Sequence, residues 1–194
     1  MRLQPYIKHT QPTGRYKIID ALVDKLYTLT YCDTALNEYN WFEDGSVFGL
    51  ARIAQDEFKK RYPEILQRNN QYTPLVPDDS YKSMAFFYDN GRGDYIGGSR
   101  VAEWDFSVIV WYDRCKITNK QQEIIDIFAR EVKEALYSVG AEPQSIYIER
   151  EQVYSAFDLE YFDKQYMHAP YNAFRIDFKA LERCDAHSNN KFIR

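Results

Sequence analysis

Asp105 and Ser107 occupy alternate positions in the most strand-like run of the chain, residues 104–113, and a glycine-rich stretch precedes them. Alternate residues of a strand project from the same face. Two carboxylates placed in this way can hold a divalent cation for phosphoryl transfer. Here a serine stands where the second carboxylate is needed. Glu103 shares the face of Asp105, but Glu103 or Asp113 would complete such a site only with an unusual geometry.

The stretch Gly97-Gly98-Ser99 followed by Asp105-Phe106-Ser107 resembles the nucleotidyltransferase pattern, in which a Gly-Ser loop precedes a strand that carries Asp-x-Asp. The resemblance implies a nucleotidyltransferase-like enzyme with a degenerate motif, because Ser107 replaces the second aspartate and the spacer after Ser99 is short. This enzyme is our alternative hypothesis for the function. A hairpin whose glycines allow tight turning explains the same residues without any catalytic role.

A second acidic pattern lies near the C-terminal end of the chain. Asp177-Phe178-Lys179 has the acid-x-Lys form used by nucleases, and Asp105 would supply the remaining carboxylate. The same three residues belong to Phe174–Ala180, a run that alternates apolar and charged residues. Such alternation is typical of a half-solvated strand in an antiparallel sheet. Solvation of the outward face therefore explains this pair more simply than nuclease chemistry does.

The other reactive residue types are scattered. The sequence contains no P-loop, no G-x-S-x-G and no HExxH motif, and no two cysteines form a CxxC pair. An odd number of cysteines without such spacing favours a reducing compartment. We therefore predict no cofactor, no metal site and no catalytic residue, and a protein that is not an enzyme. The isolated residues are His9, His168, His187, Cys32, Cys115 and Cys184.

Composition excludes some classes of protein. The chain has 194 residues, of which 45% are hydrophobic, and a formal net charge of −4. This charge argues against a protein that binds nucleic acid through a basic face. Aromatic residues reach 16%, with 17 tyrosines, and tyrosine is enriched at protein interfaces, although a tyrosine-rich core would use the same residues. No apolar run approaches the roughly 20 residues of a membrane span, so we expect a soluble protein without a membrane partner.

Periodicity predicts the order of the elements. Helices are expected at 16–31, 46–62 and 118–139, the last with a capping box that begins at Thr118. Strands are expected at 81–88, 104–113, 145–149 and 174–180. The predicted fold class is α+β, with a single mostly antiparallel sheet, two or three helices packed on one face, a long hairpin and extended terminal arms.

Turn residues and composition divide the chain into parts. We predict an N-terminal arm (1–15), a single α+β domain (16–184) and a polar C-terminal tail (185–194). Within the domain, glycine and turn formers predict a hairpin tip at 89–100. A mixture of acidic and aromatic residues predicts an extended insertion at 150–172.

The order of these elements resembles the tail-terminator and head–tail neck proteins of tailed bacteriophages. The resemblance rests on four segments that together cover about half of the chain: Ile18–Leu29, Ala102–Tyr112, Thr118–Val139 and Phe174–Ala180. The helix at 46–62 and the insertion depart from the pattern. The resemblance implies a structural virion protein, made in the host cytoplasm, that forms a homo-oligomeric ring, six- or twelve-fold, in the neck or at the end of the tail.

Such a ring would contact neighbouring virion proteins, for example portal or tail proteins. DNA would pass through without specific binding, because an acidic lumen repels phosphates. We assign the protein contacts to the hairpin tip and the insertion, which project from the predicted scaffold. The candidate interaction residues are Asn90, Arg92, Asp94, Tyr95, Tyr154, Phe157, Tyr161, Phe162 and Tyr166.

Overall fold

The computed structural model describes residues 6, 8, 14–32, 38–67, 71–95, 101–117, 124–161 and 168–183, and at positions 92–95, 161 and 183 it describes the backbone alone. The helices are α1 (Arg15–Tyr27), α2 (Ile124–Ser138) and α3 (Arg150–Val153), with 3-10 turns η1 (Arg114–Lys116) and η2 (Leu159–Tyr161). The strands are β1 (Thr30–Cys32), β2 (Glu38–Asn40), β3 (Val47–Gln55), β4 (Arg61–Leu66), β5 (Tyr72–Pro74), β6 (Ser83–Tyr95), β7 (Val101–Asp113), β8 (Ala141–Tyr147) and β9 (Tyr171–Arg183).

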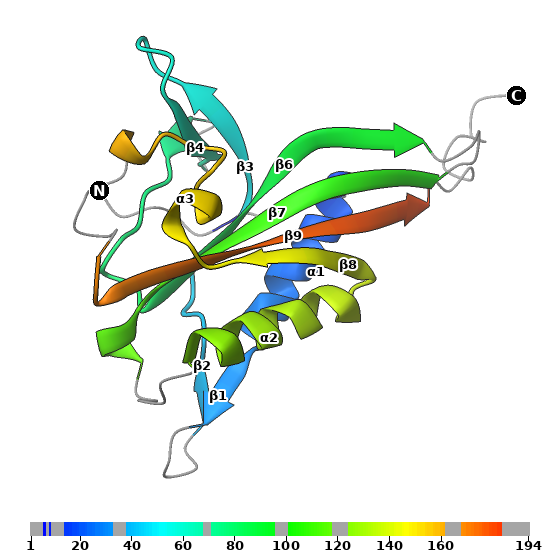
Figure 1. The fold of residues 1–194 in the computed structure, drawn as a ribbon. Coiled ribbons are helices and arrows are strands. Elements are labelled where there is room, and N and C mark those ends of the chain that lie inside the picture. Colours follow the sequence, from blue (N-terminus) through cyan, green and yellow to red (C-terminus); the bar gives the residue numbers. More distant parts are fainter. Residues whose placement is uncertain are drawn as a thin grey trace, which may run out of the picture.

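Seven strands form one sheet in the order β5-β4-β3-β6-β7-β9-β8, and β1 and β2 form a separate short hairpin. All neighbouring strands of the large sheet are antiparallel except β3 and β6, which run parallel. The long strands β6, β7 and β9 cross the centre of the molecule, and α1 and α2 lie beside them (Figure 1). The predicted α+β class and mostly antiparallel sheet are therefore confirmed. The tip of the β6–β7 hairpin, 96–100, and the predicted tail, 185–194, lie outside the described residues.

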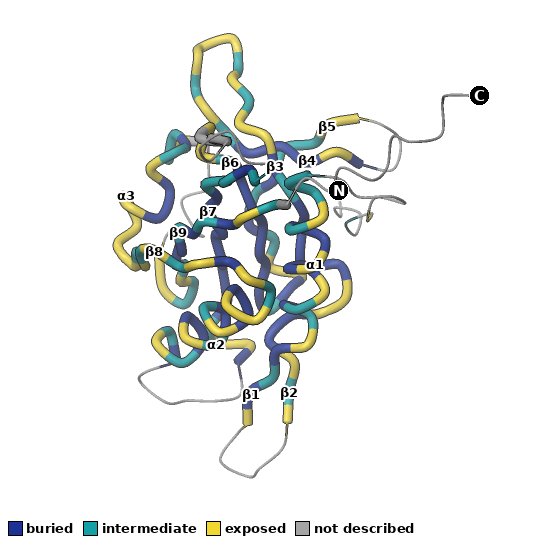
Figure 2. Tube along the Cα trace, turned by 90° about the vertical axis from the view of Figure 1, so that its right-hand side faces the viewer, coloured by how far each residue is buried: buried dark blue, intermediate teal, exposed yellow. Residues whose placement is uncertain are grey.

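The central strand β7 is buried on both faces, which explains why it is apolar on both. On one face, Phe106, Val108 and Val110 join a core that α1 and α2 cover. On the other face, Ile109 and Trp111 join a second core with residues of β3, β4 and the segment after β8. The dark blue of the central strands in Figure 2 shows this double burial. The two long helices thus share one face, as predicted, whereas α3 lies on the opposite face.

The prediction of a helix at 46–62 is wrong, because this segment forms β3, a tight turn and the first part of β4. The apolar residues there fit a helical spacing, but a short apolar run does not distinguish a helix from a buried strand. Pro63, which directly follows the predicted helix, pairs within β4 opposite Ile53. Phe58, whose spacing would place it on the apolar face of such a helix, is instead 73% exposed at the tip of the turn.

The prediction of an extended insertion at 150–172 is also wrong for most of its described part. This segment begins with α3, continues through η2 and returns to the sheet through a cis peptide bond at Pro170. Val153, Tyr154 and Phe157 pack into the second core. Their aromatic character therefore reflects burial within the chain.

Tyr6 packs against α1 and β3. Its hydroxyl donates a 2.5 Å hydrogen bond to the buried carboxylate of Asp20 in α1. Its ring lies directly on Gly49, at the point where the β3–β6 register shifts, and a Cβ at Gly49 would lie 2.0 Å from the ring. Only a glycine at this position leaves room for the ring.

Gly49→Ala should displace the Tyr6 ring and lower the free energy of unfolding by about 1–3 kcal/mol, the usual cost of overpacking. Urea unfolding measures the loss. Since the clash requires the ring, adding Gly49→Ala to Tyr6→Ala should cost much less than adding it to the wild-type chain. Equal costs in the two backgrounds would show that the ring does not occupy this position in solution.

Stability should fall in the alkaline range because Tyr112 is buried beside α2. Burial raises the pKa of its hydroxyl from 10.0 to about 12. Its contribution is fully present below pH 10. Between pH 10 and 12 the unfolded chain loses the proton that the folded chain retains, so the free energy of unfolding falls by about 1.4 kcal/mol per pH unit. Urea unfolding at pH 9 and pH 11 measures this slope, which should be shallower in Tyr112→Phe. Identical slopes would contradict the assignment.

Candidate functional site

Polar side chains gather on one face of β7 and β9, beyond the part that the second core covers. Antiparallel pairing places Asp105 opposite Lys179, and Ser107 opposite Asp177. Directly paired residues project from the same face, so the alternation seen in both strands brings the charges together. We call Asn90, Glu103, Asp105, Ser107, Asp177 and Lys179 the polar shelf.

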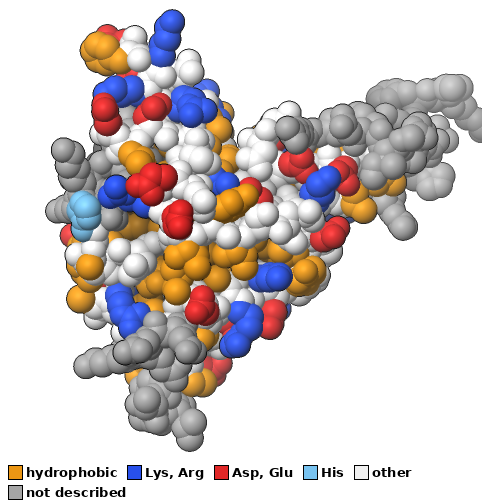
Figure 3. All heavy atoms as spheres, viewed as in Figure 1, with side chains coloured by type: hydrophobic (Ala, Val, Ile, Leu, Met, Phe, Trp, Pro, Cys, Tyr) orange, Lys and Arg blue, Asp and Glu red, His pale blue; other side chains and the backbone are white. Residues whose placement is uncertain are grey.

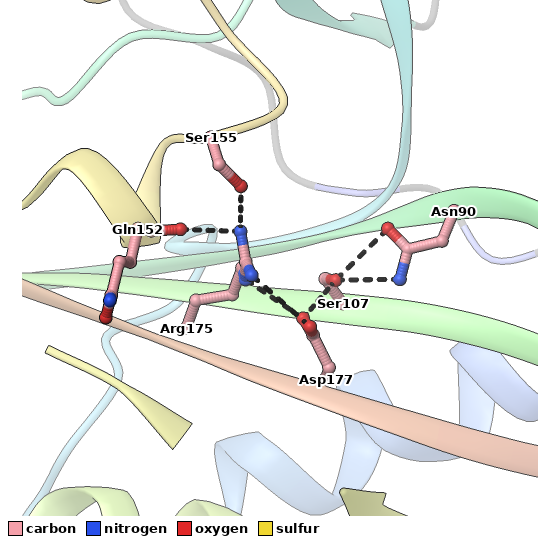
Figure 4. Close-up of polar contacts among 6 residues, drawn as sticks. All are labelled: Asn90, Ser107, Gln152, Ser155, Arg175 and Asp177. Atoms are coloured by element: carbon pink, nitrogen blue, oxygen red, sulfur yellow. Dashed lines mark hydrogen bonds and ion pairs between the residues drawn. The ribbon is translucent and has the colours of Figure 1, made fainter. Parts of the chain in front are cut away.

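Arg175 forms the buried end of this polar region and is 7% exposed. Its Nε lies 2.9 Å from Asp177 Oδ1 in an ion pair. Its Nη1 donates hydrogen bonds of 2.6 Å to the carbonyl of Gln152 and 2.5 Å to Ser155 Oγ. Figure 4 shows the guanidinium between β9 and the stretch that holds Gln152, in α3, and Ser155, just after it. Arg175 therefore clamps this segment onto the sheet.

Tyr147 packs against the guanidinium group of Arg175. Its ring centroid lies 4.2 Å from the guanidinium carbon of Arg175, a cation–π distance. The buried cation is therefore held by a carboxylate, two oxygen acceptors and an aromatic face. Burial of a charge is tolerated only with this degree of pairing.

Ser107 links the clamp to the exposed part of the shelf. Its hydroxyl donates a 2.6 Å hydrogen bond to Asp177 Oδ1 and accepts one of 3.0 Å from Asn90 Nδ2 (Figure 4). Tyr88 packs beside them, and burial raises the pKa of its hydroxyl. A nucleophilic serine needs a base that can take its proton, but Asp177 is held as the ion-pair partner of Arg175. The arrangement therefore suits structural support.

The exposed end of the shelf borders a cavity of about 360 Å³, whose polar lining comes from Asn90, Asp105, Gln144, Asp177 and Lys179. Lys179 Nζ donates a 2.5 Å hydrogen bond to Glu103 Oε1 and lies 3.9 Å from Asp105 Oδ1. This Asp105 oxygen is buried without a hydrogen-bond partner.

The shelf does not bring its acids together as metal ligands. Asp105 and Asp177 stand diagonally across the β7–β9 pair, a separation of roughly 7–8 Å between such positions. Within the described ranges, no three His, Cys, Asp or Glu residues form a group that could hold a metal ion. The loop Gly97–Ser99 of the nucleotidyltransferase-like pattern lies outside the described residues. Of the nuclease-like pattern, Asp177 forms an ion pair with Arg175, and Lys179 forms one with Glu103.

The predicted interaction residues fall into three groups. Asn90 lies exposed on the polar shelf, whereas Tyr154 and Phe157 are 3% and 4% exposed and belong to the second core. The side chains of Arg92, Asp94, Tyr95 and Tyr161, together with Phe162 and Tyr166, lie outside the described part of the chain. Tyr154 and Phe157 therefore form no part of an exposed surface of this chain.

Sequence reasoning missed two exposed apolar patches on separate elements of the sheet. The hairpin patch consists of Phe58 at the tip of the β3–β4 hairpin and Ile53 in β3, whereas the exposed side chains of Leu66 and Tyr72 pair with each other on the opposite face of the sheet. The edge patch consists of Ile146 in β8 and Ile148 just beyond it. Figure 3 shows hydrophobic side chains gathered in a band along the region of β8. An aromatic residue between charged turn residues, as in 56–61, is the signal that could have indicated the hairpin patch.

A scan against models of protein families finds no match, and a search of curated proteins also finds no significant relative. Among the described residues, no helix is both long enough and apolar enough to cross a membrane.

Proposed function

We propose that this chain is a structural subunit that assembles with copies of itself into a ring, in the neck or at the tail end of a tailed bacteriophage. The observation that carries the proposal is the exposure of large apolar side chains on two separate elements of one sheet, the β3–β4 hairpin and β8. Contiguous exposed apolar surface marks interaction sites, and we take these residues as candidates for such sites. The arrangement of α1, the β6–β7 hairpin, α2 and β9 supports the phage setting, because these elements occupy the segments on which the resemblance rests.

Two different patches favour a ring over a simple dimer. A two-fold dimer uses the same patch on both subunits, whereas a head-to-tail contact joins two different patches and closes into a ring when the rotation allows. In the strand order of the sheet, β6, β7 and β9 lie between β3, which carries part of the hairpin patch, and β8, which carries part of the edge patch. Each subunit would therefore use one patch for each of its two neighbours.

The partners follow from this setting. The ring would contact portal or tail proteins above and below it. The net charge of −4 suits a lumen through which DNA passes without binding. A strongly basic lumen would contradict this part of the proposal.

The test is the mass of the purified wild-type chain as its concentration rises. Analytical ultracentrifugation and mass photometry should show a closed oligomer, six- or twelve-fold if the phage setting is right, and electron micrographs should show rings. An antibody against the chain should label purified virions at the head–tail junction. A chain that stays monomeric up to its solubility limit would contradict the proposal.

A further inference from the structure

The cavity of about 360 Å³ beside the polar shelf crosses four neighbouring strands of the sheet. Its polar side chains come from β6 (Asn90), β7 (Asp105), β9 (Asp177 and Lys179) and β8 (Gln144). Strand pairing therefore brings together acceptor-only, donor-only and amide side chains from distant parts of the chain. A cavity of this volume falls within the usual range of small-molecule sites.

Asp105 and Lys179 are spaced for a bridging group. Lys179 Nζ lies 3.9 Å from Asp105 Oδ1, which is too far for a direct hydrogen bond. This carboxylate oxygen is buried and has no hydrogen-bond partner among the described residues. Because hydrogen bonds span about 2.7–3.0 Å, a single oxygen atom can bond to both groups. It must donate to the carboxylate and accept from the ammonium group, and a hydroxyl group does both.

Two amide side chains lie on either side of this pair in the strand order. Asn90 and Gln144 each stand where the register of strand pairing shifts, and such bulges re-aim side chains. Asn90 Nδ2 donates a hydrogen bond to Ser107 Oγ, which holds the amide in place (Figure 4). A side-chain amide both donates and accepts hydrogen bonds. Each amide can therefore bond to a hydroxyl group in either direction.

The charged side chains described on this part of the sheet face favour an uncharged ligand. They are Glu103, Asp105, Glu142, Arg175, Asp177 and Lys179. The acids outnumber the bases, so this surface repels an anion. A cation bonded to Asp105 Oδ1 would instead lie beside the ammonium group of Lys179, which is 3.9 Å from the same oxygen. A neutral ligand meets neither repulsion.

We propose that this cavity binds a saccharide unit, a neutral ligand with several neighbouring hydroxyl groups. One hydroxyl group bridges Asp105 Oδ1 and Lys179 Nζ. The hydroxyl groups beside it bond to the amides of Asn90 and Gln144. Lys179 is already held by its hydrogen bond to Glu103, so little ordering is needed on binding. The site goes beyond the proposed ring, because all of its residues come from one copy of the chain.

The test is isothermal titration calorimetry of the wild-type chain with glucose, galactose, mannose and N-acetylglucosamine at millimolar concentrations. At least one of these sugars should bind if the natural ligand is a free sugar. A glycan array tests the same chemistry when the saccharide unit belongs to a longer glycan, and binding in either format supports the proposal. Inorganic phosphate and putrescine are the charged controls, and neither should bind.

Variants of the lining locate the bound saccharide. Asp105→Asn and Lys179→Met should each weaken binding about tenfold or more, because each removes a hydrogen bond to a charged group. Gln144→Ala should also weaken binding. Gln144 is exposed and its one described hydrogen bond reaches the carbonyl of Glu142 in its own strand, so this variant should keep its fold. Circular dichroism checks the fold of all three.

Asp24→Asn is the matched control for Asp105→Asn. Asp24 is also a carboxylate that pairs with a lysine, but it lies on α1, which covers the other face of the sheet. This variant should bind the saccharide like the wild-type chain.

Three outcomes would overturn the proposal. The first is that none of the four sugars and no glycan of the array binds. The second is that phosphate or putrescine binds and no saccharide does, because the cavity would then be an ion site. The third is saccharide binding that Asp105→Asn, Lys179→Met and Gln144→Ala leave unchanged, because the ligand would then lie elsewhere. None of these outcomes depends on assembly, so the ring proposal is tested separately.

Discussion

Arg175→Met is expected to lower the free energy of unfolding by about 3–5 kcal/mol, the usual cost of removing one member of a buried ion pair. The loss is large because Asp177 would keep its charge beside the sheet, while the Gln152 carbonyl and Ser155 hydroxyl would each lose a donor. The segment after α3 would also lose its attachment. Urea unfolding measures the loss of stability, and hydrogen exchange should show faster exchange in residues 150–158 before the whole chain unfolds.

Lys179→Met is the matched control for this prediction. Lys179 lies two residues from Arg175 on the same strand and also pairs with a carboxylate, but its side chain is 40% exposed. Exposed ion pairs contribute little to stability, so this variant should unfold like the wild-type chain. If both variants lost the same stability, burial of the Arg175 clamp would not be the cause.

Phe128→Ala is expected to lower the free energy of unfolding by about 3–5 kcal/mol, because it opens a cavity in the main core. Phe128 is fully buried on α2. Its ring is stacked on Trp41, with centroids 3.9 Å apart and planes 8° from parallel. It also meets Phe174 and Tyr112 edge-on. One ring thus joins α2 to two central strands and to the loop before β3.

Two further variants control the Phe128 prediction. Since natural domains are stable by about 5–15 kcal/mol, Phe128→Ala could leave too little folded protein to measure. Phe128→Leu keeps most of the volume and should cost less than about 3 kcal/mol. Tyr137→Ala on the exposed side of the same helix should stay within about 0.5 kcal/mol of the wild-type chain. An effect of Phe128→Leu no larger than that of Tyr137→Ala would show that the stacked core is not formed in solution.

The central sheet was predictable because its strands carry their own signals. Residues 104–113 and 174–180 have the alternation and β-branched content of strands, and both lie inside longer strands, β7 and β9. The strong periodicity of 118–139 likewise predicted α2. These signals are local, so the sequence alone was sufficient.

The region 46–74 was not predictable in the same way. Its apolar residues satisfy both helical and strand patterns, and β3 is chosen because it pairs with β6 in parallel and with β4 in a hairpin. The parallel pairing of β3 with β6 joins segments more than thirty residues apart, so the local sequence of β3 contains no signal of it. The same is true of the insertion, where burial of Tyr154 and Phe157 against the sheet follows from tertiary packing.

By itself, the sequence determined the α+β class, the central strands, the two long helices and the broken carboxylate pattern at Asp105 and Ser107. Only the tertiary structure decided what the outward residues do. The strand register places Asp177 beside Ser107, and the carboxylate of Asp177 pairs with Arg175. These polar residues therefore support the packing of the chain. Sheet order separates the β3–β4 hairpin, which carries Phe58, from Ile146 in the edge strand β8. The physical reason is that periodicity assigns a residue to a face, whereas its neighbours on that face come from distant strands whose pairing the sequence does not encode locally.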